Sequence, residues 1–336
     1  MTVPPPRLTG TCLPGLCLAL GLAVGLPGPS PARAADAIQL STSQRRLNVE
    51  RPQQDSIGRL VWRGGVEITS NDPRLGGLSG LLVTADGRRM IAVSDQGHWF
   101  FARLLYDDKE RLVGLDQGRI APLRGLDGKP LVGKRWQDAE SLAALADGSY
   151  LISFERTHRI WRYPVFDPAS NARPSAWSAP PGLDQAPANG GLEALVVLAD
   201  GAILAITEKQ RDVADLAAYL WRGEGWSRLA YRRQGLFSPS GAARLPGGDI
   251  VVIERRYRLL AEPRVRLVRI PSADIRPGAR LEGREIAQWG PPLIVDNFEG
   301  IAARQAADGK TLIYLLSDDN YSALQRTLLL MFELQD

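Results

Sequence analysis

One sequence pattern, an apolar strand, a glycine-containing turn and a second apolar strand, occurs five times between Gly76 and Asp318. The copies begin GGLSGLLVTADG at Gly76, DAESLAALADG at Asp138, GGLEALVVLADG at Gly190, SPSGAARLPGG at Ser238 and NFEGIAARQAADG at Asn297. They recur at intervals of roughly 55 residues, which is close to the length of one four-stranded propeller blade. Such a repeat argues against the two competing folds, a β-sandwich and a pair of unrelated β domains.

Each copy predicts a β-hairpin, because Asp-Gly, or Gly-Gly in the fourth copy, between two β-branched or aliphatic runs is a hairpin signal. A further strand is predicted at Leu60–Thr69, and pairing it with the last hairpin would close the ring without free edges. We therefore expect an all-β fold, a β-propeller with five four-stranded blades closed by its N-terminal strand. Six blades are the alternative if residues 38–52 form strands of their own.

The first 34 residues have the features of a secretory signal peptide. Arg7 precedes an apolar stretch, Leu13–Leu26, and the small-residue site Ala32-Arg33-Ala34 follows it. The stretch is short and contains Pro14, so it does not predict a membrane span, and no later segment does. We expect a signal peptide at 1–34, an extension at 35–56, a propeller domain at 57–336, and a periplasmic or secreted location.

Both cysteines, Cys12 and Cys17, lie in the predicted signal peptide, so the mature chain would contain no disulfide. Removal of Arg7 and Arg33 would lower the formal net charge from +4 to about +2. This small charge is spread along the chain and gives no electrostatic basis for binding nucleic acid. We expect a monomer that binds a small molecule.

Carboxylates stand at both ends of several predicted hairpins. A two-residue turn at Asp147-Gly148 would place Glu140 directly opposite Glu155. The same register pairs Glu193 with Glu208 in the third copy and Glu299 with Asp318 in the fifth. Like charges in such positions destabilise an antiparallel pair, so the arrangement requires a cation, a shared proton or a basic side chain.

Oxygen ligands of this kind suit Ca²⁺, whereas a mature chain with only His98 and His158 and no cysteine offers little to zinc. The predicted metal ligands are Asp95, Glu140, Glu193, Glu254, Asn297, Glu299 and Asn320. Two alternatives stay open, neutralisation by Arg156, Lys209, Arg255 and Arg256, and shared protons. Arg255, His98 and His158 are the predicted substrate contacts. No G-x-S-x-G elbow or phosphate-binding glycine loop accompanies them.

The motifs GGLSGL…SDQGHWF, DAESLAALADG…SFER, NGGLEAL and DNFEGIA…SDDN resemble the bacterial family known for the esterase-like activity of phytase. The resemblance runs from about Leu60 to Leu334 and implies a phytase-like propeller with a calcium-dependent phosphoesterase or esterase activity. It implies site positions at Asp95, Asp138, Glu140, Glu155, Asn189, Glu193, Glu208, Glu254, Asn297, Glu299, Asp318 and Asn320. One departure is Pro239-Ser240-Gly241, where the family pattern leads us to expect an acid.

The resulting hypothesis is an exported hydrolase in which ring carboxylates hold Ca²⁺. Glu155, Glu208 and Asp318 would serve as further ligands or as the general base. Two alternatives remain, a lactonase-type propeller hydrolase and a non-catalytic propeller whose cation only relieves repulsion.

Overall fold

The computed structural model describes residues 1–4, 35–165, 173–208, 215–256 and 262–335. Apart from residues 1–4, the predicted signal peptide lies outside them. Among the described residues, no helix combines the length and the apolar character needed to cross a membrane.

The long strands form five antiparallel units of four strands, which we call blades 1 to 5. Blade 1 consists of β5 (Leu78–Val83), β6 (Arg89–Ser94), β7 (His98–Tyr106) and β8 (Leu112–Pro122). Blade 2 consists of β9 (Ala139–Ala144), β10 (Tyr150–Phe154), β11 (Arg159–Tyr163) and β12 (Ser175–Trp177). Blade 3 consists of β13 (Leu192–Val197), β14 (Ile203–Thr207), β15 (Asp215–Arg222) and β16 (Gly225–Arg232).

Blades 4 and 5 complete the ring. Blade 4 consists of β17 (Ser238–Arg244), β18 (Ile250–Arg256), β19 (Arg264–Ile270) and β21 (Arg284–Trp289). Blade 5 consists of β22 (Phe298–Gln305), β23 (Thr311–Ser317), β24 (Leu328–Leu334) and β4 (Leu60–Thr69). The inner strands contact one another in a closed cycle, β5 to β9, β13, β17, β22 and back to β5. The predicted β-propeller class is confirmed.

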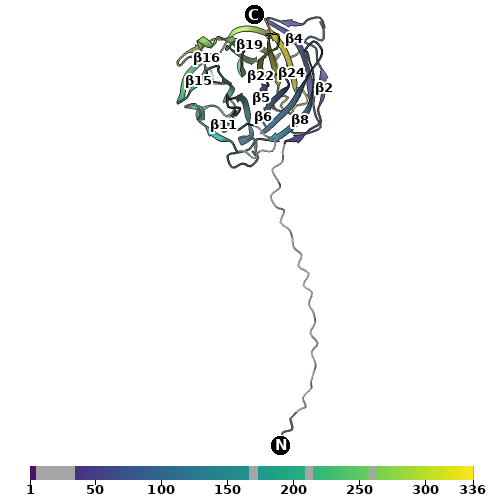
Figure 1. The fold of residues 1–336 in the computed structure, drawn as a ribbon. Helices are drawn as coiled ribbons and strands as arrows, with labels where there is room; N and C mark the ends of the chain where they lie inside the picture. The colour runs from purple at the N-terminus through teal and green to yellow at the C-terminus, as the bar shows by residue number, and fades with distance from the viewer. Residues whose placement is uncertain (5–34, 166–172, 209–214, 257–261, 336) are drawn as a thin grey trace. The chain divides into compact units, whose positions relative to one another are not determined.

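The ring is closed by β4, as predicted. This early strand pairs antiparallel with the late strand β24, with Leu330 opposite Gly65, and Figure 1 shows the two side by side. Among residues 38–52, the one strand is β2 (Ser41–Gln44), which pairs with β4 and so extends blade 5 instead of forming a separate sheet. A single parallel bridge between Gly64 and Leu112 joins β4 to β8 of blade 1.

The remaining elements are short. They are β1 (Asp36–Ala37) on β8, β3 (Ser56–Ile57) on β4, β20 (Arg280–Leu281) on β16, the helix α1 (Lys134–Gln137), and two 3-10 turns at Leu183–Gln185 and Ser272–Asp274.

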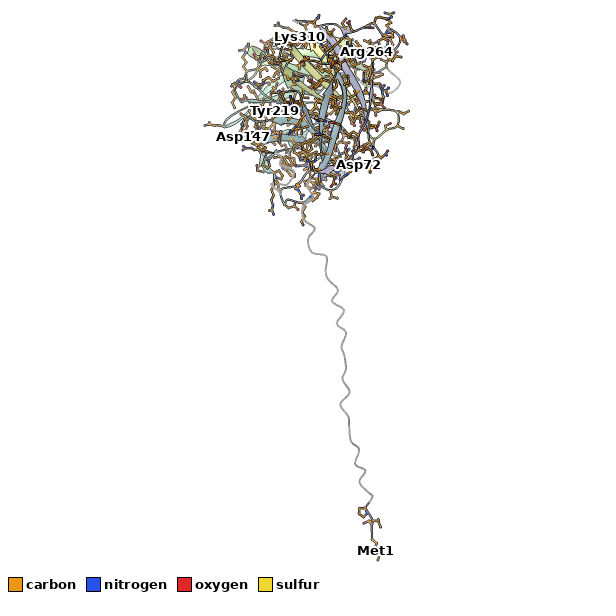
Figure 2. All side chains as sticks on the ribbon, turned by 45° about the vertical axis from the view of Figure 1, so that its right-hand side comes forward. Met1, Asp72, Asp147, Tyr219, Arg264 and Lys310 are labelled. Carbon is orange, nitrogen blue, oxygen red and sulfur yellow. The ribbon has the colours of Figure 1, made fainter. Side chains whose placement is uncertain are left out.

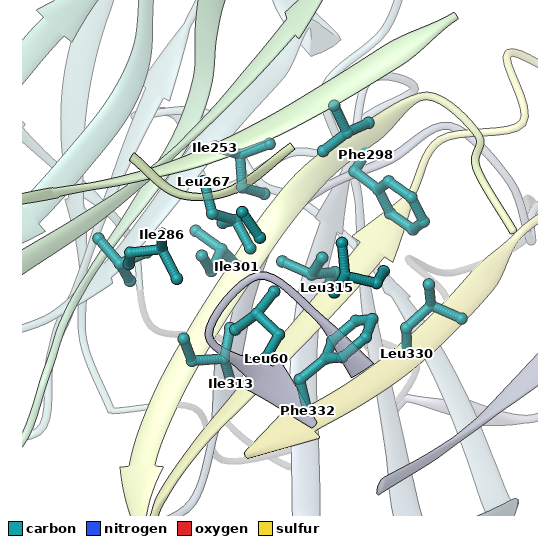
Figure 3. Close-up of a cluster of buried hydrophobic side chains, with 14 of the residues drawn as sticks. Leu60, Ile253, Leu267, Ile286, Phe298, Ile301, Ile313, Leu315, Leu330 and Phe332 are labelled. Atoms are coloured by element: carbon teal, nitrogen blue, oxygen red, sulfur yellow. The ribbon is translucent and has the colours of Figure 1, made fainter. Parts of the chain in front are cut away.

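Buried apolar side chains form five clusters, one at each seam between neighbouring blades. Figure 3 shows the cluster between blades 4 and 5, where Ile253 and Leu267 of blade 4 pack toward Ile301 and Phe332 of blade 5. Because both faces of each sheet are covered, the inner strands are almost continuously apolar beyond their first residues. This explains why the repeats contain so little polar and apolar alternation.

A cavity of about 170 Å³ lies on the axis along the later part of the inner strands. Its lining is mainly aliphatic, with Leu81, Leu142 and Leu195 among the residues, and also includes Arg244. The strands approach so closely that a β-carbon on Gly241 would lie 2.3 Å from the carbonyl oxygen of Glu299, and one on Gly300 would lie 2.5 Å from that of Ser79. These glycines are needed for contact between neighbouring blades.

Candidate functional site: a ring of carboxylates

The inner strand of every blade contains a β-bulge near its beginning. In blade 2, Ser141 pairs with Ser153 and Ala139 pairs with Phe154, which leaves Glu140 as the extra residue. The bulges of the other blades contain Ser79, Glu193, Ser240 and Glu299. A bulge reorients the side chain that it contains, and here it does so at the same end of all five blades.

This register corrects the predicted pairing of the carboxylates, which was wrong in all three hairpins. The trailing residues pair with the residue two positions before each bulge: Glu155 with Asp138, Glu208 with Gly191 and Asp318 with Asn297. One cause is the turn, which contains three residues instead of two, since the Leu145 N–H donates to the Ser149 carbonyl. Gly148 adopts φ 83° there, as a three-residue hairpin loop requires. The bulge then shifts the register again.

The three-residue turn recurs in blades 3, 4 and 5, whereas the turn of blade 1 contains four residues, since the Thr84 N–H donates to the Arg89 carbonyl. Figure 2 labels Asp147 in the turn of blade 2 and Lys310 directly after the turn of blade 5. Gly201 and Gly309 adopt φ 83° and 86° at the equivalent of Gly148. These turns lie at the opposite end of the inner strands from the bulges, so the carboxylates are separated from them by the apolar axis.

Eight carboxylates gather at the bulged end of the axis, and we call them the carboxylate ring. They are Asp95, Asp138, Glu140, Glu155, Glu193, Glu208, Glu299 and Asp318. Six are buried, and Asp95 and Glu140 are half-buried. Glu193 interacts electrostatically with members from blades 2, 3 and 5. The acids therefore gather at one face of the ring, as predicted, although the predicted strand register is wrong.

Burial and mutual repulsion hold protons in the ring. Burial, followed by the charge of Glu299, raises the pKa of Asp318 to about 9 and raises that of Glu140 well above its usual value. Burial also raises the pKa of Glu155 to about 6, and it raises the pKa of Glu193 strongly. The metal-free ring therefore carries several protons at neutral pH.

Blade 4 breaks the pattern of trailing acids with an arginine. Arg255 pairs with Ser238 and so occupies the position that Asp95, Glu155, Glu208 and Asp318 occupy elsewhere. Its guanidinium lies 2.7 Å from Glu299 and 3.6 Å from Glu208, and it also donates a hydrogen bond to Asn297. Burial alone would lower the pKa of Arg255, but the charges of Glu299 and Glu208 raise it. Arg255 is thus engaged within the ring, as the alternative of neutralisation by basic side chains expects, and its role as a substrate contact stays a prediction.

A lysine that the sequence analysis overlooked bridges blades 1 and 2. Lys134, at the start of α1, places its Nζ 2.5 Å from Asp95 and 2.5 Å from Asp138. Arg156 contacts the other oxygen of Asp138 at 2.7 Å. Lys134 lies four residues before Asp138, a spacing that could have indicated the ion pair had the short helix been predicted.

The carboxylates of Glu140, Glu155 and Glu193 lie at the seam of blades 2 and 3. Ligand oxygens of Asp138, Glu140 and Glu155 lie within 4.8 Å of one another. Glu155 accepts a hydrogen bond from the Gly191 N–H at 2.5 Å and shares another with the Glu193 carboxyl. Within the described residues, no lysine or arginine forms an ion pair with Glu140, Glu155 or Glu193.

The remaining predicted oxygen ligands are divided between the ring and its surroundings. Asn297 donates to Glu299 at 3.0 Å, and the Asn320 N–H donates to Asp318 at 2.6 Å. The Asn320 side chain is exposed, as is Asn189. Ser79 donates to Glu299 at 3.0 Å, whereas the hydroxyl of Ser240 donates to the Phe298 carbonyl.

Glu254 lies apart from the carboxylate ring. Its carboxylate accepts hydrogen bonds from Arg266 at 2.6 Å and from the Tyr231 hydroxyl at 2.8 Å, and it is almost completely buried. Because Arg255 takes the trailing position, the neighbouring Glu254 faces into the blade. We therefore leave it out of the ligand set.

The two histidines also lie outside the ring. His158 Nε2 contacts the Pro187 carbonyl at 3.0 Å, and burial lowers the pKa of His98. The Nδ1 atoms of both are buried without a hydrogen-bond partner among the described residues. Both imidazoles are half-buried, and their role as substrate contacts stays a prediction.

Comparison with known proteins places this architecture in a family. The family "Phytase-like", described as "Esterase-like activity of phytase", matches residues 73–321. The chain belongs to this family. The match covers all five bulges, so the carboxylate ring of this Phytase-like protein lies within the family region. No curated protein sequence matches the chain.

Solved structures with low similarity were also found. The PQQ-bound aldose sugar dehydrogenase from Streptomyces coelicolor is 12% identical, with a TM-score of 0.46 over 89% of this chain and 99% of that one. A putative gluconolactonase is 13% identical, with a TM-score of 0.44 over 90% and 98%. A gluconolactonase from Xanthomonas campestris is 12% identical, with a TM-score of 0.40 over 90% and 98%.

Proposed function

We propose that this Phytase-like protein is an exported hydrolase in which the carboxylate ring binds Ca²⁺ and acts on a phosphate or carboxylic ester. The observation that carries the proposal is that the carboxylates of the ring outnumber their basic partners. Eight carboxylates converge, and the described residues supply three basic partners, Lys134, Arg156 and Arg255. Buried charges are normally paired or bound to a metal.

The residues at the seam of blades 2 and 3 fit a calcium ion. All the donors are oxygens, as Ca²⁺ prefers, and two oxygens bound to one Ca²⁺ at about 2.4 Å lie at most about 5 Å apart. The separation of up to 4.8 Å among Asp138, Glu140 and Glu155 satisfies this limit. The hydrogen bond between Glu155 and Glu193 requires a proton, which a cation would replace.

Asp138, Glu140 and Glu155, whose oxygens satisfy this spacing, would hold the ion, with Glu193 beside Glu155. When bound, Ca²⁺ would polarise the ester and lower the pKa of an attacking water. Asp318 keeps its proton at neutral pH, so it fits the role of proton donor to the leaving group better than that of a base. Glu208 is the candidate for accepting the proton of the water, and Arg255 at 3.6 Å orients it.

A neutral ester or lactone is the second candidate substrate, favoured by the electrostatics of the ring. Arg255 and Lys134 are both committed to carboxylates, so neither is available to bind a phosphate. A ring with excess negative charge repels an anion unless the metal compensates.

The test compares hydrolysis of a phosphomonoester, a simple carboxylic ester and a lactone by purified protein, with calcium and with a chelator. We expect turnover of at least one of them that falls at least 100-fold on chelation and in Glu193→Gln. Turnover that is indifferent to both would refute the metal mechanism. A calcium-dependent rise in melting temperature without turnover of any substrate would indicate the non-catalytic alternative.

Export is tested separately by N-terminal sequencing of the protein from the periplasm or the medium of its host. We expect the mature chain to begin at Ala35, where the described part of the propeller region begins and which is itself buried. A chain that keeps residues 1–34 in the cytoplasm would contradict export.

A further inference from the structure

A cavity distinct from the axial one lies between blades 1 and 2, toward the end of the hairpins that contains the turns. It has a volume of about 410 Å³, which falls within the range of roughly 300–1,000 Å³ that small-molecule sites occupy. Its lining includes Thr84 and Arg89, which flank the turn of blade 1, and Tyr150, the first residue of β10. The carboxylate ring lies at the opposite end of the same hairpins, so the two sites are separate.

The difference in size between the two blades leaves room for this cavity. The outer strands β11 and β12 of blade 2 have five and three residues, whereas β7 and β8 of blade 1 have nine and eleven. Blade 2 therefore covers only part of the facing side of blade 1. Ile91, Phe101 and Tyr150, which border the buried cluster at this seam, remain half-buried.

Aromatic side chains form one wall of the cavity. Phe101 and Tyr150 belong to the lining. The Trp99 ring contacts both: it stacks on Phe101 with 6.0 Å between the ring centroids and lies edge-on to Tyr150 at 5.6 Å. The Tyr150 hydroxyl forms no hydrogen bond with a described residue, and burial raises its pKa, so it keeps its proton. The wall thus offers apolar rings and one available donor.

Three arginines line the cavity, and no aspartate or glutamate does. Arg89, Arg103 and Arg119 lie on the same side of blade 1 as Phe101, since Arg89 pairs with Arg103 and Phe101 pairs with Arg119 across neighbouring strands. Like charges in directly paired positions repel each other. Arg103 has a counter-charge in Asp116, with which it forms an ion pair.

Arg89 and Arg119 have no such counter-charge in the described parts of the chain. Neither forms an ion pair there, and Arg119 donates one hydrogen bond, to the Ala35 carbonyl at 3.3 Å. Asp86, in the adjacent turn, is exposed to solvent, where attraction between charges is weak. Guanidinium groups bind carboxylates and tetrahedral anions through paired N–H donors. An anion in the cavity would therefore relieve the repulsion between the arginines.

We propose that this cavity binds a small aromatic anion, with its acidic group at the guanidinium groups of Arg89 and Arg119 and its ring against Phe101 and Tyr150. The inference is independent of the proposed hydrolase, because no carboxylate of the ring lines the cavity. Binding of the anion should therefore require no calcium.

The experiment measures the binding of 2-naphthoate, naphthalene-2-sulfonate and the neutral 2-naphthamide by isothermal titration calorimetry, with chelator and with calcium. At least one anion should bind about 10-fold more tightly than the amide, and equally well in both conditions. Arg89→Met and Arg119→Met should each weaken its binding by about 5-fold or more. Arg88→Met is the matched control, because it removes the same charge from an exposed neighbour outside the lining, and it should leave the affinity unchanged.

Circular dichroism establishes that each variant is folded, and Arg89 and Arg119 are both exposed, so a result from either one suffices. Binding of neither anion, or equal binding of the anions and the amide, would overturn the site. An affinity that both Met variants leave unchanged would place the anion elsewhere and overturn it as well. Binding that is lost in chelator would assign the anion to a metal in the carboxylate ring, against this inference. Failure of the cavity to bind an anion would leave hydrolysis by the ring untouched.

Discussion

Glu193 is the residue at which metal binding and stability are most directly linked. Its carboxyl is buried, and burial and four acidic neighbours raise its pKa strongly. Glu193→Gln keeps the shape and removes the charge. In chelator we expect the variant to be as stable as wild type or up to about 2 kcal/mol more stable, because a neutral amide no longer requires a proton.

In calcium, wild type should be more stable than Glu193→Gln, since wild type gains the binding free energy of the ion and the variant does not. The measurement is urea unfolding with calcium and with chelator, and the exposed Glu224→Gln serves as control. Equal calcium stabilisation of Glu193→Gln and wild type would contradict the assignment.

Glu254 should behave in the opposite way although it belongs to the same family pattern. Glu254→Gln would leave the buried guanidinium of Arg266 without its counter-charge. We expect a loss of about 3–5 kcal/mol in the free energy of unfolding, with no change in the number of calcium ions bound. Loss of the ion with little loss of stability would return Glu254 to the ligand set.

The sequence identified the acids of the ring and named Arg156 and Arg255 among their possible partners, but it did not identify Lys134 or show which acids each partner contacts. The repeat placed Glu140, Glu193 and Glu299 at equivalent positions, and this required only counting along the chain. The engagement of Arg255 with Glu299 and of Lys134 with Asp138 depends on contacts between blades or on a four-residue helix. Such contacts leave no periodic signal.

At the level of single elements, the bulge is the device that builds the site. It places one side chain per blade outside the regular alternation. In blades 1, 4 and 5 a glycine follows that side chain and lets neighbouring inner strands touch. A β-carbon on Gly80 would lie 2.5 Å from the backbone nitrogen of Leu142 in the next blade.

Gly80→Ala should therefore destabilise the protein by about 1–3 kcal/mol through overpacking. Gly247→Ala is the control, because a β-carbon there would have no atom within 4 Å and its φ is not in the left-handed region. The measurement is urea unfolding of both variants. Equal stability of the two would show that the blades can separate at no cost.

The strands themselves could be predicted, whereas their register could not. Asp-Gly indicates a hairpin, but two-residue and three-residue loops use the same residues, and here Ala146 joins the loop. The predicted turn is one residue too short, and the bulge at Glu140 shifts the register once more. Glu140 and Glu155 are therefore not opposite each other, as the sequence had suggested.

For the whole molecule, the ring makes stability depend on pH. The folded-state pKa values of Asp318 and Glu155, about 9 and about 6, are raised above their usual values. The folded protein then binds more protons than the unfolded chain between about pH 4 and pH 9, so in chelator its stability should fall as the pH rises through this window.

Calcium should reduce this fall, because its ligands must be deprotonated and its affinity increases with pH. The measurement is urea unfolding at pH 5, 7 and 9 with chelator and with calcium. A stability in chelator that rises with pH would show that the ring is already fully ionised and neutralised by basic residues.

The inner strands approach one another closely at Gly80, Gly241 and Gly300, and the cavity beyond the carboxylate ring on the axis has about 170 Å³. If the ring is the active site proposed above, we expect substrate and product to use the same mouth, so each turnover would have to empty the site before the next begins. A polymer would then offer an end or a side group to the ring instead of passing along the axis.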